Sequence, residues 1–337
     1  MATVVLRKFD CVVVPRPGGP PTVQATLNQP ASGEAAVHLG TFVRLNAMRL
    51  GTAHGAHFVA VLSELALVLS RLRTTFTDPL RLAPAFWQSS SHIRRFVTES
   101  CGLGLLSWSV AHFEDWRFPY RLQHIDNLPV AERQAVSLGR LRPDLLFDIG
   151  GLQVAGEARG RSSHPPPSEY VVCPTAQQDR LDQLAMWSEA LGDARWIMAW
   201  TRCSDSTTVA DYFDPGERTS LIPDRVLAQV RRQWENRLWA TAPLFDAFFL
   251  GRRLRGNWLL VDPAPQPDGT QRRLFLGVSD SELESPPPPL PPEFPIDERF
   301  EVDAAGRLAV IVDTFRATQP PPNVTALARR WGQGRNA

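Results

Sequence analysis

A stretch of alternating apolar and polar residues around a Gly-Gly pair, residues 142–159, constrains the fold of this chain more than any other feature. Gly150 and Gly151 predict a two-residue hairpin turn, because the favoured turn type needs positive φ at both central positions. Counting back from that turn along the two strands places Asp144 directly opposite Glu157. The sequence therefore predicts a β-hairpin that carries two facing carboxylates.

The alternation divides this hairpin into two faces, since successive strand side chains point to opposite sides. One face is apolar and is expected to pack on the core, and the other carries the charges. The apolar face holds Leu145, Phe147, Ile149, Leu152, Val154 and Ala158. The charged face holds Asp144, Leu146, Asp148, Gln153, Ala155, Glu157 and Arg159. The clean separation supports the register independently of any motif.

Two opposed carboxylates have Cβ atoms roughly 5 Å apart, a spacing at which like charges repel. Either the face is solvated and needs no function, or a cation lies between Asp144 and Glu157. Mg²⁺ suits the second case, because it binds one or two carboxylates together with waters. Arg159 points to the same face and brings positive charge to it. The hairpin alone leaves both interpretations open.

The motifs of this hairpin resemble those of the PD-(D/E)XK nuclease superfamily. Pro143-Asp144 matches the first motif, and Glu157-Ala158-Arg159 matches the second with arginine in place of the usual lysine. The resemblance covers about residues 91–203. It implies an α/β fold with a restriction-endonuclease-like core, a mixed β-sheet flanked by helices, and extra elements at both ends of the chain.

Two further positions fit the superfamily pattern. Glu99 lies where an acidic residue on a preceding helix is expected, and Gln183 lies where a Gln-x-x-x-aromatic helix follows, ending at Trp187. Gln178, earlier on the same helix, is an alternative to Gln183. The resemblance thus implies that Asp144, Glu157 and Glu99 bind Mg²⁺ or Mn²⁺, and that Asp144, Glu157, Arg159 and Gln183 are catalytic.

The resemblance implies a metal-dependent nuclease that cuts nucleic acid, with DNA as the expected substrate and bacterial antiviral defence as a role. Arg159 departs from the pattern, because arginine suits phosphate but cannot act as a base. The enzyme then activates water through metal alone. The alternative is a degenerate nuclease-fold subunit that binds nucleic acid or a protein partner and does not cut.

Three arginines near the hairpin are candidates for phosphate binding, namely Arg140 and Arg142 before one strand and Arg161 after the other. Gly160 adds a small residue suited to close approach to a phosphate backbone. The net charge of +1 gives no global basic field, and Lys8 is the only lysine, so any attraction has to be local. Solvated arginines at strand ends are the alternative.

Periodicity and proline content divide the chain into five parts. They are residues 1–90 (short strands broken by prolines, then a helix over 55–75), 91–220 (the nuclease-like part), 221–284 (helices within 224–249, strands at 257–262 and 272–278), 285–295 (a proline-rich spacer) and 296–337 (a hairpin of 299–302 and 308–315, then a helix). Within 91–220 we expect helices over 91–101 and 175–192, an extended stretch over 108–124 and a strand over 195–201.

The composition, 43% apolar and 21% charged, is that of a globular protein. No apolar run reaches the ~18 residues of a membrane span. Four scattered cysteines form no CxxC pair, which indicates reduced thiols and a cytoplasmic location. A protein partner or a homo-oligomer is compatible with this sequence. His54 and His57 lack acidic or cysteine neighbours, whereas His164 follows the hairpin closely enough to reach its site.

Overall fold

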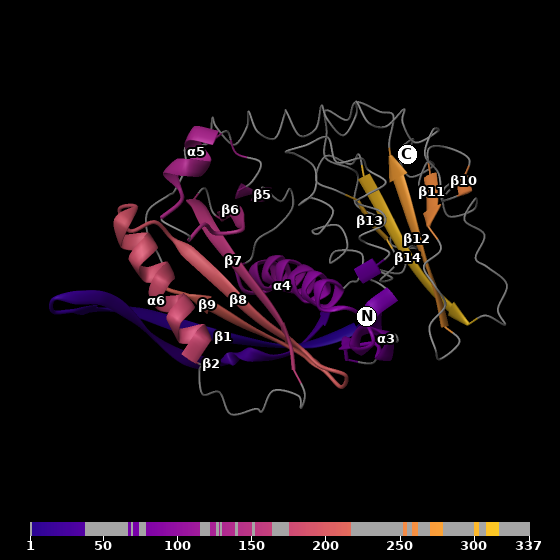
Figure 1. Cartoon of the computed structure of the whole chain (residues 1–337), viewed down its shortest axis with the longest axis horizontal. Coiled ribbons are helices and arrows are strands. Elements are labelled where there is room, and N and C mark those ends of the chain that lie inside the picture. Colours follow the sequence, from indigo (N-terminus) through magenta and orange to yellow (C-terminus); the bar gives the residue numbers. More distant parts are fainter. Residues whose placement is uncertain are drawn as a thin grey trace.

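The structure, a computed structural model, describes residues 2–37, 67–68, 70–73, 79–114, 122–125, 128, 130–138, 141–149, 152–163 and 175–216, with the strand segments 252–254, 258–261, 270–278, 300–302 and 308–316. The fold is α/β. A mixed sheet of seven strands, in the order β2-β1-β9-β8-β7-β6-β5, is flanked by helices (Figure 1).

Two long antiparallel strands, β1 (Ala2–Arg16) and β2 (Gly19–Val37), form one side of this sheet. The break predicted around Pro17 and Gly18 is confirmed, because β1 ends at Arg16 and β2 begins at Gly19, but the break predicted at Gln29-Pro30 was wrong, because β2 continues through it. β2 is an edge strand, where proline is tolerated, and the β1 register shifts between Val14 and Arg16, at Pro15. β1 also pairs with β9, so the sheet extends across the boundary predicted at residue 90.

The remaining strands of the sheet are β5 (Leu122–His124), β6 (Leu145–Ile149), β7 (Leu152–Ser162), β8 (Trp196–Cys203) and β9 (Thr208–Asp214). β7 is antiparallel to β6 and parallel to β8, which makes the sheet mixed. The hairpin register is confirmed, because Ile149 pairs with Leu152 and Leu145 with Gly156.

The helices are α3 (Pro84–Trp87), α4 (Ser91–Phe113), α5 (Val130–Ala135) and α6 (Thr175–Ala190). α4 begins at Ser91 as predicted but does not end near Cys101, and residues 108–113 are helical rather than extended. The reason is close packing: a Cβ on Gly102 would lie 2.9 Å from the Gly160 nitrogen of β7, so glycine lets the helix cross the strand.

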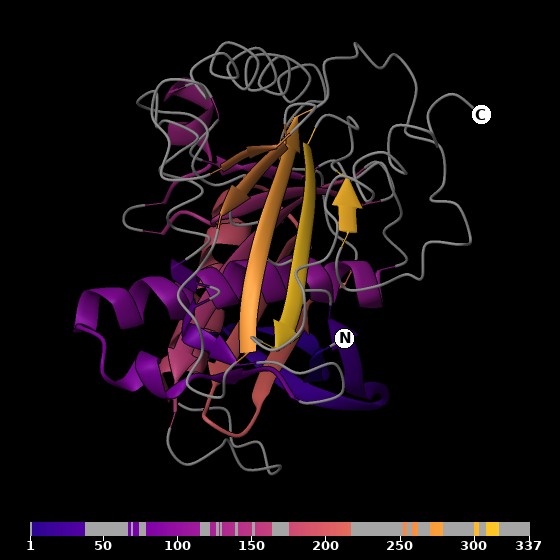
Figure 2. The same cartoon turned by 90° about the vertical axis from the view of Figure 1, so that its right-hand side faces the viewer.

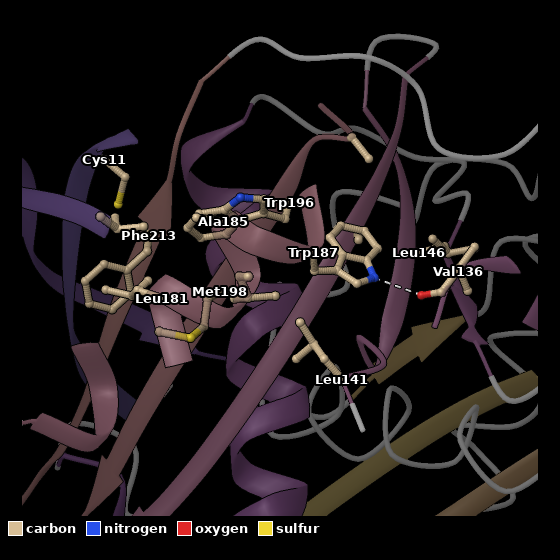
Figure 3. Close-up of a cluster of buried hydrophobic side chains, with 14 of the residues drawn as sticks. Cys11, Val136, Leu141, Leu146, Leu181, Ala185, Trp187, Trp196, Met198 and Phe213 are labelled. Carbon is tan, nitrogen blue, oxygen red and sulfur yellow. Dashed lines mark hydrogen bonds between the residues drawn. The ribbon is translucent and has the colours of Figure 1, made fainter. Parts of the chain in front are cut away.

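α4 and α6 cover opposite faces of the sheet, and the hairpin is buried on both. The α4 face packs Leu103, Leu106 and Val110 against Phe147, Val154 and Ala158. The α6 face packs Leu181, Leu184 and Trp187 against Leu146, Ala155, Trp196 and Met198, and Trp187 donates a hydrogen bond to the Val136 carbonyl, 2.9 Å (Figure 3). The charged face of the hairpin is therefore not a solvated surface.

A second sheet of five antiparallel strands has the order β10-β11-β12-β14-β13 (Figure 2). Its strands are β10 (Arg252–Leu254), β11 (Trp258–Val261), β12 (Thr270–Val278), β13 (Phe300–Val302) and β14 (Leu308–Arg316). Both strands predicted in 221–284 and the C-terminal hairpin are confirmed, and β10 was missed. The helices predicted in 224–249, the spacer and the terminal helix lie outside the described residues.

The helix predicted over 55–75 lies mostly outside the described residues, and its end was misplaced, because Leu72–Arg73 form β3, paired with β4 (Arg81–Leu82). Cys11, Cys101 and Cys203 are buried and form no disulfide. Among the helices that the structure describes, none has the length and apolar character to cross a membrane.

Candidate functional site

Asp144 lies one residue before β6 and is fixed by two hydrogen bonds to β7. Its backbone N–H donates to the Gly156 carbonyl, 2.8 Å, and its Oδ2 accepts from the Ala158 N–H, 2.9 Å. These two partners are the residues on either side of Glu157. Asp144 thus continues the hairpin register to the position opposite Glu157, as the sequence predicts.

Glu157 lies on β7 with its side chain directed toward α6, and it is only 1% exposed. Its Oε1 accepts hydrogen bonds from Arg180 of α6, with Nε at 2.9 Å and Nη2 at 2.6 Å. The same oxygen lies 2.7 Å from Nη2 of Arg159. Its second oxygen, Oε2, is buried and has no hydrogen-bond partner among the described residues. One oxygen thus contacts two arginines, whereas the other has no donor in the part of the chain that the structure describes.

The electrostatics of Glu157 are set by opposing effects. Burial raises its pKa most, and the negative charge of Asp144 raises it further. Arg159 and Arg180 lower it, but the net result is a pKa raised from 4.5 to about 7. Near neutral pH this carboxyl group is therefore divided between its neutral and ionised forms.

Four charged side chains make up the centre of the site. Asp144 and Glu157 supply two negative charges, and Arg159 and Arg180 supply two positive ones. The cluster is formally neutral when both carboxyl groups are ionised. The described cluster therefore needs no cation for its charges to balance.

Arg180 is the residue that sequence reasoning missed. Its Nη1 donates to Oε1 of Gln183, 3.0 Å, so Gln183 reaches Glu157 through Arg180 rather than directly. The available signal was spacing, because residues three apart on a helix share a face. Gln178, the alternative to Gln183, instead donates to the Val23 carbonyl, 2.7 Å, and helps to join α6 to β2.

Glu99 is not brought to the carboxylate pair. It lies on α4, which covers the opposite face of β7, and its Oε1 accepts from Arg95 Nε at 2.8 Å. In the part of the chain that the structure describes, no group of three or more His, Cys, Asp or Glu residues is placed to hold a metal ion. Asp144 and Glu157 are thus the two predicted metal ligands that the fold places together.

The predicted nucleic-acid contacts have different environments. Arg161 and Arg142 are exposed, and Arg140 lies outside the described residues, as do His54, His57 and His164. The expectation that Gly160 approaches a phosphate was wrong. A Cβ there would lie 1.6 Å from the Thr98 carbonyl oxygen, so its open side is taken by α4.

No family model matches this chain, and neither does any curated protein or solved structure. Fold and site together define an α/β protein in which a hairpin of the mixed sheet supplies Asp144, Glu157 and Arg159, helix α6 supplies Arg180, and Glu157 is buried between them.

Proposed function

We propose that this protein is a metal-dependent nuclease that hydrolyses phosphodiester bonds of nucleic acid, with DNA as substrate, on a restriction-endonuclease-like core. The observation that carries the proposal is the buried Oε2 of Glu157, which has no hydrogen-bond partner among the described residues, beside the negative charge of Asp144. A buried carboxylate oxygen without a donor is costly, and a cation would offset that cost.

The donor chemistry of this pair suits Mg²⁺ or Mn²⁺. Both metals prefer oxygen ligands, and Mg²⁺ is commonly held by one or two carboxylates plus waters. Asp144 and Glu157 would hold the ion, which when bound polarises a phosphate and acidifies water. A cation there would also favour the ionised form of Glu157, which burial and Asp144 disfavour.

The arginines supply the remaining functions. Arg159 is about one-third exposed, with its side chain at 35%, and its guanidinium can pair with two phosphate oxygens. Arg180 is anchored between Glu157 and Gln183, so it orients the carboxyl group from the helix side. Neither arginine accepts a proton, so no protein base is assigned to this pair.

The test is cleavage of plasmid and single-stranded DNA with Mg²⁺ or Mn²⁺, for the wild type, Asp144→Asn and Glu157→Gln. Glu189→Gln is the matched control, because Glu189 is an exposed glutamate on α6. We expect cutting that needs metal, disappears in the two site variants and persists in the control. Cutting that survives in both site variants would contradict the proposal.

The neutral cluster favours a second candidate, a nuclease-like fold that binds nucleic acid or a protein partner without cutting. Its support is that Glu157 is already held by two arginines and is 1% exposed. Calorimetric titration with Mn²⁺ separates the two. Binding that is lost in Asp144→Asn supports the nuclease, and no binding together with no cutting supports the second candidate.

A further inference from the structure

Beyond Glu157, strands β7 and β8 place basic side chains next to one another. The parallel pairing puts Arg159 beside Trp200 and Arg161 beside Arg202. Trp200 packs in the cluster formed with α6, and side chains alternate along each strand, so all four residues lie on the α6 side of the sheet. These four residues form a row along β7 and β8. The row begins at Arg159, which contacts Glu157, and ends at Arg161 and Arg202, farther along the two strands.

Arg161 is exposed, and its guanidinium lies over the ring of Trp200. Its Cζ lies 5.7 Å from the centre of the Trp200 ring, a distance at which a guanidinium and an aromatic ring attract each other. Trp200 is only 5% exposed, so the ring is a rigid support. A guanidinium over an aromatic face keeps its N–H groups available for hydrogen bonds to an anion.

Arg202 shares its only described carboxylate partner, Asp211, with a second arginine. The Asp211 side chain is fully buried and pairs with both Arg202 and Arg7 of β1, one carboxylate for two arginines. Gln177, in the first turn of α6, also donates to Asp211, at 3.3 Å. The Nε of Arg202 is buried and has no hydrogen-bond partner within the described ranges, and 16% of the side chain remains exposed.

The site cluster is formally neutral, but adding the arginines of β7, β8 and β1 gives the described residues a local excess of positive charge, although the whole chain carries only +1. Among the described residues in these contacts, five arginines (Arg7, Arg159, Arg161, Arg180 and Arg202) accompany three carboxyl groups (Asp144, Glu157 and Asp211). Adjacent strands lie about 4.8 Å apart and alternate residues about 7 Å apart, so the guanidinium groups span a short stretch. Evenly spaced phosphates match such an arrangement better than single carboxylates do.

We propose that Arg159, Arg161 and Arg202 bind neighbouring phosphates of one nucleic-acid strand, which crosses β7 and β8 on its way to Asp144 and Glu157. This inference rests on the proposed function and names the path of its substrate. Arg202, with its pairing to Asp211, is the part of this path that the hairpin motifs do not contain. The cation–π contact between Arg161 and Trp200 positions one of the three arginines.

The test is fluorescence anisotropy of a labelled oligonucleotide, single-stranded and duplex, with the full chain in EDTA over a range of salt concentrations. The variants are Arg161→Gln and Arg202→Gln. Arg95→Gln is the matched control, because it removes an exposed arginine on α4, across the sheet. Log affinity falls as log salt concentration rises, and each variant should make this slope shallower by about 0.7 on single strands or about 0.9 on duplex. The control should leave the slope unchanged.

Binding and cleavage then separate the two proposals. An unchanged slope in Arg161→Gln, or no binding by the wild type, overturns the path even if metal-dependent cutting is found. A reduced slope without any cutting supports the path and contradicts the nuclease. Tighter binding to polyglutamate than to the oligonucleotide also overturns it. Because Arg202 is partly structural, a lowered Tm in Arg202→Gln leaves the decision to Arg161→Gln, whose side chain is exposed.

Discussion

Nη2 of Arg180 lies 2.6 Å from Oε1 of Glu157, and Nε of the same arginine lies 2.9 Å from that oxygen. Arg159 adds a second cation at 2.7 Å. Even so, the pKa of Glu157 is raised to about 7, because burial and Asp144 outweigh both arginines. Ionisation of Glu157 is therefore less favourable in the folded protein than in the unfolded chain. The free energy of unfolding should consequently depend on pH between about 4.5 and 7.

Glu157→Gln should make the protein more stable at pH 8. The folded pKa is above the ordinary 4.5, so the stabilisation from Glu157 is complete below pH 4.5 and is lost as the pH rises toward 7. That difference corresponds to about 3 kcal/mol, which glutamine retains because it is neutral. Urea unfolding of both proteins between pH 4.5 and 8 measures it.

The control for this prediction is Glu189→Gln, on the exposed side of α6. It should change stability by less than about 0.5 kcal/mol, as is typical of a surface substitution. A Glu157→Gln protein that loses stability at pH 8 would show that the two arginines, and not burial, dominate at this carboxyl group.

Arg180→Met should destabilise the protein in a pH-dependent way. At pH 8 the variant removes one of the two cations that favour the ionised form of Glu157 and so raises the pKa of this carboxyl group further, for a loss of about 2 kcal/mol. At pH 5 Glu157 is neutral, and the loss should be much smaller. Combining Arg180→Met with Glu157→Gln should remove most of the pH dependence, which a double-mutant cycle by urea unfolding tests. Equal losses at pH 5 and pH 8 would mean that Arg180 acts through packing alone.

The hairpin was predictable because its determinants are local. A Gly-Gly turn and strict alternation fix the register, so the position of Asp144 opposite Glu157 follows from counting residues. The burial of that face was not predictable in the same way, because it depends on α6, whose Arg180 lies 23 residues beyond Glu157. The residues next to an arginine on a helix do not indicate which distant residue it will contact.

The length of α4 was also not predictable from local sequence, because the helix continues beyond the end that its glycines predict. Two glycines lower helix propensity and predict an end near Cys101. In the structure Gly102 is where α4 meets Gly160 of β7, so tertiary packing overrides local propensity. Asp211, which joins arginines of β1 and β8, likewise becomes visible only when the sheet order is known.

Gly160→Ala should be strongly destabilising, by about 3 kcal/mol or more. The added Cβ would lie 1.6 Å from the Thr98 carbonyl oxygen, so α4 or β7 has to move. Gly33→Ala on β2 is the control, since a Cβ there meets nothing within 4 Å, and it should change stability by less than about 0.5 kcal/mol. Thermal and urea unfolding compare the two. Similar stabilities would contradict the close crossing of α4 and β7.

Arg159 decides how the proposed nuclease works without the usual lysine. If its charge stabilises the phosphate in the transition state, Arg159→Gln should lower the metal-dependent cleavage rate by about 100-fold or more, the typical cost of losing such a donor. Arg159→Lys keeps the charge and should stay within about tenfold of the wild type. Single-turnover cleavage with saturating Mn²⁺ measures both, and urea unfolding verifies that each variant is folded.

If Arg159→Gln cuts as fast as the wild type, Arg159 serves only to hold Glu157 Oε1, at its 2.7 Å contact. If Arg159→Lys is instead far faster than the wild type, proton transfer limits the natural enzyme, because lysine can act as a base where arginine cannot.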